Sequence, residues 1–309
     1  MKDFFRLIRY ENLLMIVLMQ LVFRYGFLQL SHVPSALLDW QYVLLILSTI
    51  CIAAAGYIIN DIYDQDTDRM NRPTARVVGT RISEGSAYNF YIGLNVVGVG
   101  IGFYLSNLIG KPGFAMIFIA VAGTLYLYSA SLKQIMLLGN LVIAVLSAFS
   151  IVLVGIFDLY PAITPQNNLL MGTVFKVLLD YAMFCFIISF IRELVKDLED
   201  VNGDYNAGMN TLPIALGVTR VVNITFALSF VPIITLLYYI NKYYIANDLY
   251  IGASFTLLMV VGPLIYFTIK CRTARTSKEF HTLSQVLKFV LLAGIISVVI
   301  ITLNIKMNA

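Results

Sequence analysis

Two short segments of this 309-residue chain, 60–68 and 196–204, repeat one unusual spacing of aspartates. The aspartates occupy positions i, i+3 and i+7 of each segment: Asp61, Asp64 and Asp68 in the first, and Asp197, Asp200 and Asp204 in the second. These positions share one face of an α-helix, so each segment can place three carboxylates side by side. Three anions so close repel one another unless a cation lies between them.

The carboxylate stripes favour a magnesium site. Mg²⁺ prefers oxygen ligands in octahedral geometry and usually takes one or two carboxylates together with waters and substrate phosphates. Two facing stripes therefore predict that metal ions hold a diphosphate between the segments. A solvated charged loop is the alternative for one acidic cluster, and the repeated spacing argues against it. Asp66 and Glu199 fall off the stripes, and we expect them to be solvated or to support the metal ligands.

Basic residues stand beside the acids, as a polyanion site requires, because Arg and Lys donate directly to phosphate oxygens. Lys133 stands alone in a short polar stretch between two apolar runs. The other basic neighbours are Arg69, Arg72, Arg76, Arg192 and Lys196. Some of these could simply pair with adjacent carboxylates.

The rest of the chain predicts where these segments lie. Its residues are 60% hydrophobic and 12% charged, against about 45–50% and about 25% in a soluble domain, which excludes a soluble enzyme. The net charge of +4, without a basic patch, argues against nucleic acid as a partner. Runs of about 20 apolar residues predict membrane helices. We expect nine spans, at 12–30, 40–59, 88–107, 114–130, 135–156, 171–191, 214–237, 249–269 and 286–304.

The distribution of basic residues predicts the orientation. Nine spans with a cytoplasmic N-terminus place both acidic segments on the cytoplasmic side. All but five of the 21 Lys and Arg residues then fall on that side; the exceptions are Arg24, Lys111, Lys176, Lys242 and Lys306. This bias follows the positive-inside rule. We expect an integral protein of the cytoplasmic membrane with its active site on the cytoplasmic side.

The first segment resembles a signature of the UbiA superfamily of intramembrane prenyltransferases. The resembling residues are Asn60, Asp61, Asp64 and Asp68, followed by Arg69, Asn71, Arg72 and Pro73. The second segment is similar to the Asp-rich signature after the sixth helix of that family, and segment 126–129 with Lys133 also matches. The resemblance covers nearly the whole chain and implies one domain over 1–309. The expected fold is an all-α bundle of nine transmembrane helices with two Asp-rich cytoplasmic loops.

The resemblance implies an allylic diphosphate donor held by Mg²⁺ and ionised to a carbocation-like allyl group, which an acceptor then captures. In that scheme the six aspartates bind metal, and the Asn60 amide orients or ligates it. Arg72 and Lys133 are the leading diphosphate donors, supported by Arg69, Arg76, Arg192 and Lys196. Tyr57, Tyr126 and Tyr128 are candidates to face the allyl cation, because an aromatic face stabilises a nearby cation. Arg9 and Asn12 are candidates on the acceptor side.

The acceptor stays open at this stage. Segment 192–204, followed by Thr211, Leu212 and Pro213, most resembles digeranylgeranylglyceryl phosphate synthases, which implies geranylgeranyl diphosphate as donor and geranylgeranylglyceryl phosphate as acceptor in ether-lipid biosynthesis. An aromatic acceptor of quinone biosynthesis, such as 4-hydroxybenzoate or a naphthoate, is the alternative. A secondary transporter is a more remote one, because it would place its acids near helix centres rather than at helix ends.

Overall fold

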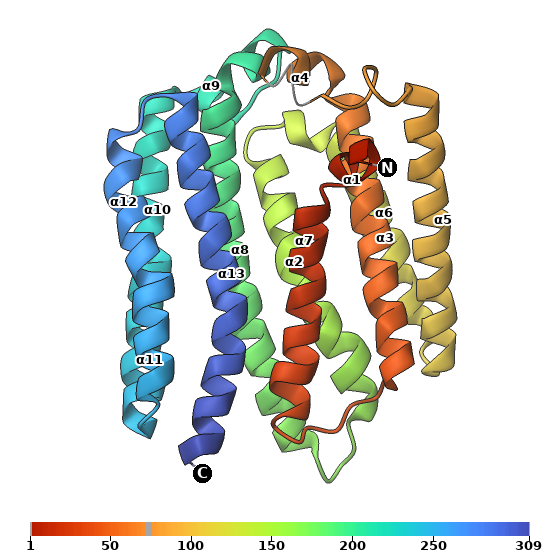
Figure 1. Ribbon diagram of the computed structural model, residues 1–309, viewed down its shortest axis with the longest axis vertical. Helices are drawn as coiled ribbons and strands as arrows, with labels where there is room; N and C mark the ends of the chain where they lie inside the picture. The colour runs from red at the N-terminus through yellow and green to blue at the C-terminus, as the bar shows by residue number, and fades with distance from the viewer. Residues whose placement is uncertain (1, 72–75, 309) are drawn as a thin grey trace.

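The computed structural model describes residues 2–71 and 76–308, which form a bundle of long helices (Figure 1). Within these residues nine segments are long and apolar enough to cross a membrane, as expected. They are Tyr10–Gln29, Asp39–Tyr63, Glu84–Leu108, Pro112–Ala130, Leu138–Ala162, Asn168–Asn206, Val218–Asn247, Tyr250–Thr273 and Ser277–Asn308. The two termini lie toward opposite ends of the bundle, as an odd number of spans requires (Figure 1).

The first four spans pack around one helix. The elements in this half are α1 (Lys2–Leu7), α2 (Tyr10–Leu21), η1 (Val22–Gln29), α3 (Asp39–Tyr63), α5 (Glu84–Leu108) and α6 (Ala115–Ala130). Helix α3 packs against α2, α5 and α6. A Cβ at Gly98 of α5 would lie 2.8 Å from the Ile52 side chain, so glycine permits the close approach of α5 to α3.

The last five spans pack around α8. The elements here are α7 (Leu138–Val154), η4 (Gly155–Leu159), α8 (Asn168–Asn206), α9 (Leu212–Leu216), α10 (Val218–Tyr239), α11 (Tyr250–Thr256), η8 (Leu257–Val261), α12 (Gly262–Thr273) and α13 (Ser277–Asn308). Helix α8 contacts α7, α10 and α13. It also contacts the short helix α4 (Gln65–Asn71), which follows α3, and so joins the two halves of the bundle.

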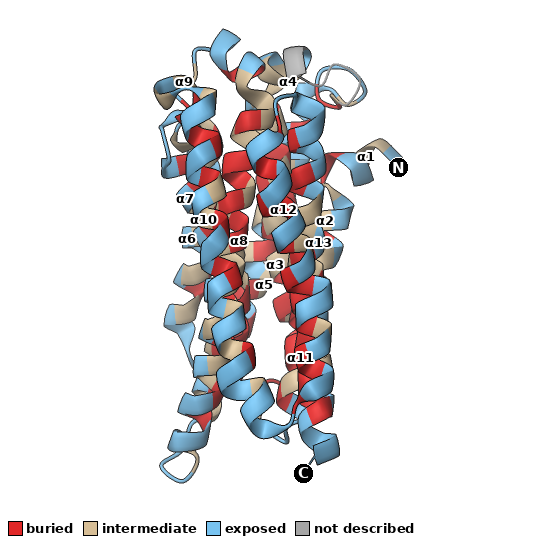
Figure 2. Ribbon diagram, turned by 90° about the vertical axis from the view of Figure 1, so that its left-hand side faces the viewer, coloured by how far each residue is buried: buried red, intermediate tan, exposed pale blue. Residues whose placement is uncertain are grey.

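The helices bury their inward faces and expose apolar side chains outward (Figure 2). Leu169 and Leu258 are 88% and 71% exposed, for example. Such exposure is the opposite of what water favours, and it fits a bundle surrounded by lipid, where helices satisfy their own backbone hydrogen bonds. The chain is therefore an integral membrane protein.

The acidic segments are more helical than the expected loops. Helix α8 has 39 residues and runs through the whole second segment to Asn206. At about 1.5 Å per residue it is roughly 58 Å long, about twice the hydrocarbon thickness of a bilayer, so its last turns project beyond the membrane. The first segment occupies the end of α3 and the short α4 (Gln65–Asn71). The Asp68 backbone N–H donates to the Asp64 carbonyl at 2.8 Å, so helical hydrogen bonding resumes directly after α3.

A buried ion pair fixes the opposite end of the bundle. The Arg24 guanidinium is 2% exposed and donates to Asp158 Oδ2 at 2.7 Å and to the Leu37 carbonyl at 2.7 Å. Asp158 Oδ1 in turn accepts from the Leu37 backbone N–H at 3.0 Å. Charges within membrane spans are costly unless paired. This pair therefore ties η1 to η4 and to the connection before α3.

Candidate active site

The first acidic segment is held by donors from two other parts of the chain. Asn60 and Asp61 lie in the last turn of α3, and Asp64 caps that helix. Arg9, just before α2, donates to Asp61 Oδ1 at 2.7 Å and more weakly to Asn60 Oδ1 at 3.3 Å. Asn60 Nδ2 donates to Asp64 Oδ2 at 2.7 Å. The Lys133 ammonium, from the connection between α6 and α7, donates to Asp64 Oδ1.

Charge complementarity sets the protonation of this cluster. Desolvation works to lower the pKa of the Arg9 guanidinium, but Asp61, Tyr57 and Asp64 together outweigh it and raise the pKa above its usual value. Arg9 therefore stays protonated at any physiological pH. The Lys133 side chain is only 8% exposed, so its charge is compensated by Asp64 rather than by water.

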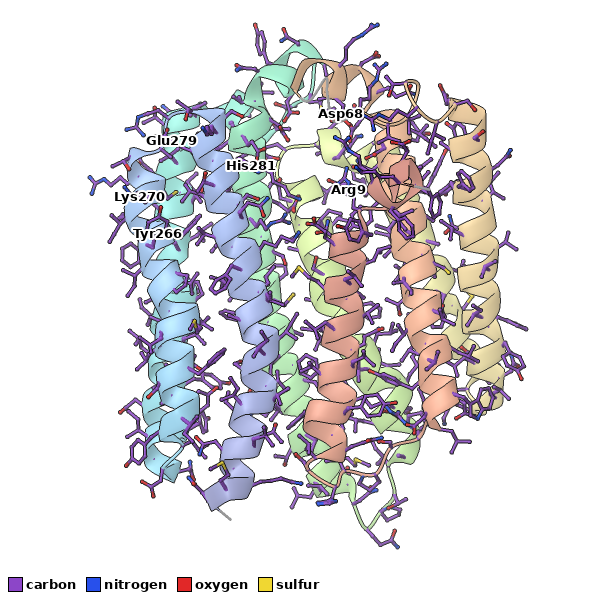
Figure 3. The ribbon with its side chains drawn as sticks, in the orientation of Figure 1. Arg9, Asp68, Tyr266, Lys270, Glu279 and His281 are labelled. Carbon is purple, nitrogen blue, oxygen red and sulfur yellow. The ribbon has the colours of Figure 1, made fainter. Side chains whose placement is uncertain are left out.

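The second acidic segment faces the first. Asp197, Asp200 and Asp204 lie on α8 at the expected helical spacing, and α8 packs against α4, which carries Asp68. Asn140 of α7 donates to Asp197 Oδ2 at 2.9 Å. The buried Asp204 carboxylate is close enough to interact electrostatically with Asp64 and Lys133. The two acidic segments therefore lie at the same end of the bundle, and Figure 3 shows Asp68 toward the same end as Arg9.

Below the acids a cavity of about 310 Å³ extends into the membrane-spanning part. Asn60 and Arg9 line its upper end, together with Tyr57 and Tyr128. Its deeper walls are mostly apolar and come from α2, η1, α3, α6, α7, α8 and α13. The arrangement offers a polar, charged head and an apolar tail region, which suits an amphiphile.

The structure places two of the three candidate tyrosines at the cavity and the third away from it. Tyr128 lines the cavity and interacts electrostatically with Asp64, Glu193 and Asp197, so it lies between the two acidic segments. Tyr57 lines the cavity beneath Arg9, whose guanidinium carbon is 5.2 Å from its ring centroid. Tyr126 is 41% exposed and places its ring against Tyr63, with centroids 6.3 Å apart. The structure thus does not bring Tyr126 to the cavity, because residues two apart on a helix face different sides.

The candidate cations also differ in whether they line the cavity. Arg192, Lys196 and Arg9 line the cavity, as does the neutral acceptor-side candidate Asn12. Arg69 is exposed on α4 and Arg76 is half-buried before α5, and neither belongs to the cavity lining among the described residues. Arg72 lies outside the described residues.

Two predicted diphosphate donors, Arg192 and Lys196, lie around Glu193, and their neighbour Lys288 was not among the predicted site residues. Lys196 Nζ donates to Glu193 Oε1 at 2.6 Å, and Arg192 Nη1 is 3.8 Å from the same oxygen. The Arg192 Nε is buried without a hydrogen-bond partner. Lys288 of α13 also lines the cavity and donates to Glu11 at 3.0 Å. The sequence did offer one sign of this role, because Lys288 is a single lysine within the apolar run of the last span.

The donor set suits a hard divalent cation. It consists of carboxylate oxygens and the Asn60 amide oxygen, the ligand types that Mg²⁺ prefers. In the described part of the chain no three His, Cys, Asp or Glu side chains converge on one metal position. Oxygens of these aspartates instead accept hydrogen bonds from protein side chains: Asp61 from Arg9, Asp64 from Lys133 and Asp197 from Asn140. These partners are the groups that metal and diphosphate would have to displace or share.

Known proteins match this sequence over most of its length. The profile described as the UbiA prenyltransferase family matches residues 21–292. The digeranylgeranylglyceryl phosphate synthase of Hyperthermus butylicus is 30% identical over 271 residues, 87% of this chain and 84% of that one. The synthase of the same name from Sulfolobus acidocaldarius is 35% identical over 166 residues, 54% of each chain.

Solved structures share the fold. A UbiA homologue from Aeropyrum pernix aligns with a TM-score of 0.66 at 17% identity, covering 93% of this chain and 97% of that one. A UbiA homologue from Archaeoglobus fulgidus bound to GPP and Mg²⁺ aligns with a TM-score of 0.59 at 16% identity, covering 96% and 99%. The family match sets aside the transporter alternative. This chain belongs to the UbiA prenyltransferase family and is a membrane-embedded prenyltransferase.

Proposed function

We propose that this enzyme transfers a geranylgeranyl group from geranylgeranyl diphosphate to the free hydroxyl of geranylgeranylglyceryl phosphate, in a reaction that requires Mg²⁺. The observation that carries the proposal is the placement of two facing carboxylate stripes at the polar end of an apolar cavity. The name shared by relatives such as the Hyperthermus butylicus protein supports the acceptor. The homologue bound to GPP and Mg²⁺ supports a metal-dependent diphosphate donor.

Asp61, Asp64 and Asp68 would hold metal from one side, and Asp197, Asp200 and Asp204 from the other, with Asn60 orienting the first set. Bound Mg²⁺ would supply charge that stabilises the diphosphate as it leaves. Lys133 would add a direct N–H donor at the same place. Fixed donors of this kind stabilise developing charge without reorganising during the reaction.

The chain's own residues then shape the transfer. The bond between the donor's first carbon and the diphosphate oxygen breaks, and its electron pair leaves with the diphosphate. Tyr128 and Tyr57 would present aromatic rings to the resulting allyl cation. The acceptor hydroxyl oxygen forms the new ether bond to that carbon, and its proton passes to the released diphosphate. The apolar cavity keeps water, a competing nucleophile, from the cation.

The basic cluster favours an acceptor that carries a phosphate. Arg192, Lys196 and Lys288 line the cavity, and Glu193 offsets part of their charge. The Arg192 Nε is a buried donor without a partner, a condition that costs free energy until an acceptor fills it. The Arg9 guanidinium is already engaged by Asp61, so it is less suited to bind the carboxylate of an aromatic acid.

Purified protein in detergent tests the proposal. Geranylgeranyl diphosphate and Mg²⁺ are supplied with either geranylgeranylglyceryl phosphate or 4-hydroxybenzoate, and each reaction has an EDTA control. We expect an ether product with the glyceryl phosphate and none in EDTA. A product with the aromatic acid alone would keep prenyl transfer and move the enzyme to quinone biosynthesis.

A further inference from the structure

Lys288 of α13 lies between the cavity and a carboxylate outside it. The Lys288 side chain is 22% exposed and belongs to the cavity lining. Its Nζ donates to Glu11 Oε2, in the first turn of α2, at 3.0 Å. The Glu11 side chain is 66% exposed and is not part of the cavity lining among the described residues. The lysine therefore has the cavity on one side and a surface partner on the other.

The packing of α13 on α8 places Lys288 at the level of Arg192. The two helices contact each other and run in opposite directions (Figure 1). Two contacts fix their register: His281 Nδ1 is 3.0 Å from Glu199 Oε1, and a Cβ on Gly294 would lie 3.3 Å from the Phe184 ring. Position 288 falls midway between the two contacts on α13, and the matching point on α8 is about residue 191.

Lys288 and Arg192 are the cations of the cavity with the weakest compensation from within it. Glu193 is the one carboxylate of the cavity lining among the described residues. Its Oε1 is 2.6 Å from Lys196 Nζ but 3.8 Å from Arg192 Nη1. The Arg192 Nε is buried without a hydrogen-bond partner, and Lys288 takes its counter-charge from outside the cavity.

A phosphate monoester complements these two cations. At pH 7 it carries a charge of about −1.5 to −2 and three strong acceptor oxygens. An ammonium on a four-carbon stem is flexible enough to change partners. An exposed ion pair such as that of Lys288 with Glu11 contributes little to stability. A phosphate in the cavity can therefore take the lysine from Glu11, whose carboxylate is then left in contact with water.

We propose that Lys288 exchanges Glu11 for the phosphate of the acceptor and, together with Arg192, selects acceptors that carry a phosphate. This inference rests on the proposed function, because it adds a specificity-determining residue to the acceptor side of the same site. Glu11 is the counter-ion of Lys288 until the acceptor binds. An acceptor without a phosphate would leave Lys288 on Glu11 and the buried Arg192 Nε without a partner, which is unfavourable.

Steady-state kinetics in detergent with Mg²⁺, varying each substrate in turn, test the exchange. Lys288→Met should raise KM for geranylgeranylglyceryl phosphate about tenfold and KM for geranylgeranyl diphosphate by no more than about twofold, because it removes one charge-assisted hydrogen bond to the acceptor. Lys288→Arg keeps the charge and should stay closer to the parent. Glu11→Gln removes a weak competitor and should lower the acceptor KM about two- to threefold.

The double variant separates exchange from a structural role. In the Lys288→Met background, Glu11→Gln should have no further effect on the acceptor KM, because the two residues act through one contact. Asp3→Asn is the matched control. It removes another exposed ion pair, with Arg81 at 2.8 Å, whose residues are outside the cavity lining of the described chain, and it should change neither KM.

Two results would overturn the exchange while leaving prenyl transfer in place. One is an unchanged acceptor KM in Lys288→Met, and the other is an acceptor KM that does not fall in Glu11→Gln. Failure of the parent to form an ether product from geranylgeranylglyceryl phosphate would instead contradict the proposed function itself.

Discussion

The Asp64 carboxylate illustrates how single residues connect the site. Asn60 reaches it from one turn earlier, and Lys133 reaches it from a connection 69 positions away in sequence. Asp64 therefore links the end of α3 to the connection between α6 and α7. A change at Lys133 would remove a proposed diphosphate donor and would leave the negative charge of Asp64 less compensated.

For this reason we expect Lys133→Met to lower kcat/KM for prenyl transfer by roughly a hundredfold or more, as loss of a fixed charge-stabilising donor does in other enzymes. Lys133→Arg, which keeps the charge, should retain more activity than Lys133→Met. Steady-state kinetics with both substrates measures the effect, and the detergent melting temperature controls for folding. Unchanged kcat/KM in Lys133→Met would remove this residue from the site.

Arg192 tests the acceptor side. Arg192→Met should raise KM for geranylgeranylglyceryl phosphate by about tenfold or more, the equivalent of one charge-assisted hydrogen bond, and change KM for the donor much less. Lys278→Met, an exposed lysine at the start of α13, is the control and should change neither constant. An equal rise in both KM values would place Arg192 on the donor diphosphate instead.

The sequence predicted the acidic stripes better than the residues around them. The spacing of Asp197, Asp200 and Asp204 is a local property of one helix and needs no tertiary information. The choice between Tyr126 and Tyr128 depends on the rotation of α6, which its nearly all-apolar composition does not fix. The contributions of Asn140 and Lys288 depend on how α7 and α13 pack, so spacing alone could not find them.

At the scale of elements, one glycine positions the Lys133 connection. A Cβ at Gly139, in the first turn of α7, would lie 2.8 Å from the Lys133 Cα and 3.3 Å from the Leu132 carbonyl oxygen. Both are backbone atoms, which cannot rotate away as a side chain would. The start of α7 therefore approaches the connection closely because residue 139 is glycine.

We expect Gly139→Ala to displace Lys133 and lower kcat/KM by about tenfold, since small misplacements of a catalytic group are costly. Gly123→Ala on α6 is the matched control, because a Cβ there meets no atom within 4 Å. The control should keep full activity. Full activity in Gly139→Ala would show that the connection tolerates the shift.

The buried ion pair between Arg24 and Asp158, at the other end of the bundle, holds η1 against η4. Arg24→Met would leave Asp158 buried and unpaired, so we expect it to destabilise the protein by about 3–5 kcal/mol. Removing the second charge as well, in Arg24→Met with Asp158→Asn, should restore part of that loss. Thermal unfolding in detergent measures both. A double variant less stable than the single variant would contradict the pairing argument.

The number of membrane-spanning helices was predictable from the sequence, but the residues at which the helices end were less so. Long apolar runs fix where spans cross a membrane, and all nine expected segments lie within or overlap the observed ones. Hydropathy falls at the membrane boundary, however, whereas α8 continues as a helix through its acidic turns to Asn206. Polar residues can extend a helix beyond the membrane, so a change in polarity was an unreliable sign of a loop.

At the scale of the whole molecule, charge predicts orientation. Arg9, Lys270 and His281 lie toward one end of the bundle with the acidic segments (Figure 3), while the C-terminus lies toward the other (Figure 1). We expect the acidic end to face the cytoplasm, following the positive-inside rule. Alkaline phosphatase fused after residue 309 should then be active, and the same enzyme fused after residue 275 inactive. The reverse pattern would invert the topology.

The central claim is that two facing acidic stripes form one Mg²⁺-dependent prenyl diphosphate site. The most direct measurement is the rate of prenyl transfer over a series of Mg²⁺ concentrations, for the parent, Asp64→Asn and Asp200→Asn. We predict that EDTA abolishes parental activity, that Mg²⁺ restores it, and that neither variant recovers at any Mg²⁺ concentration while both remain folded. Parental activity that persists in EDTA, or full activity in either variant, would contradict the account.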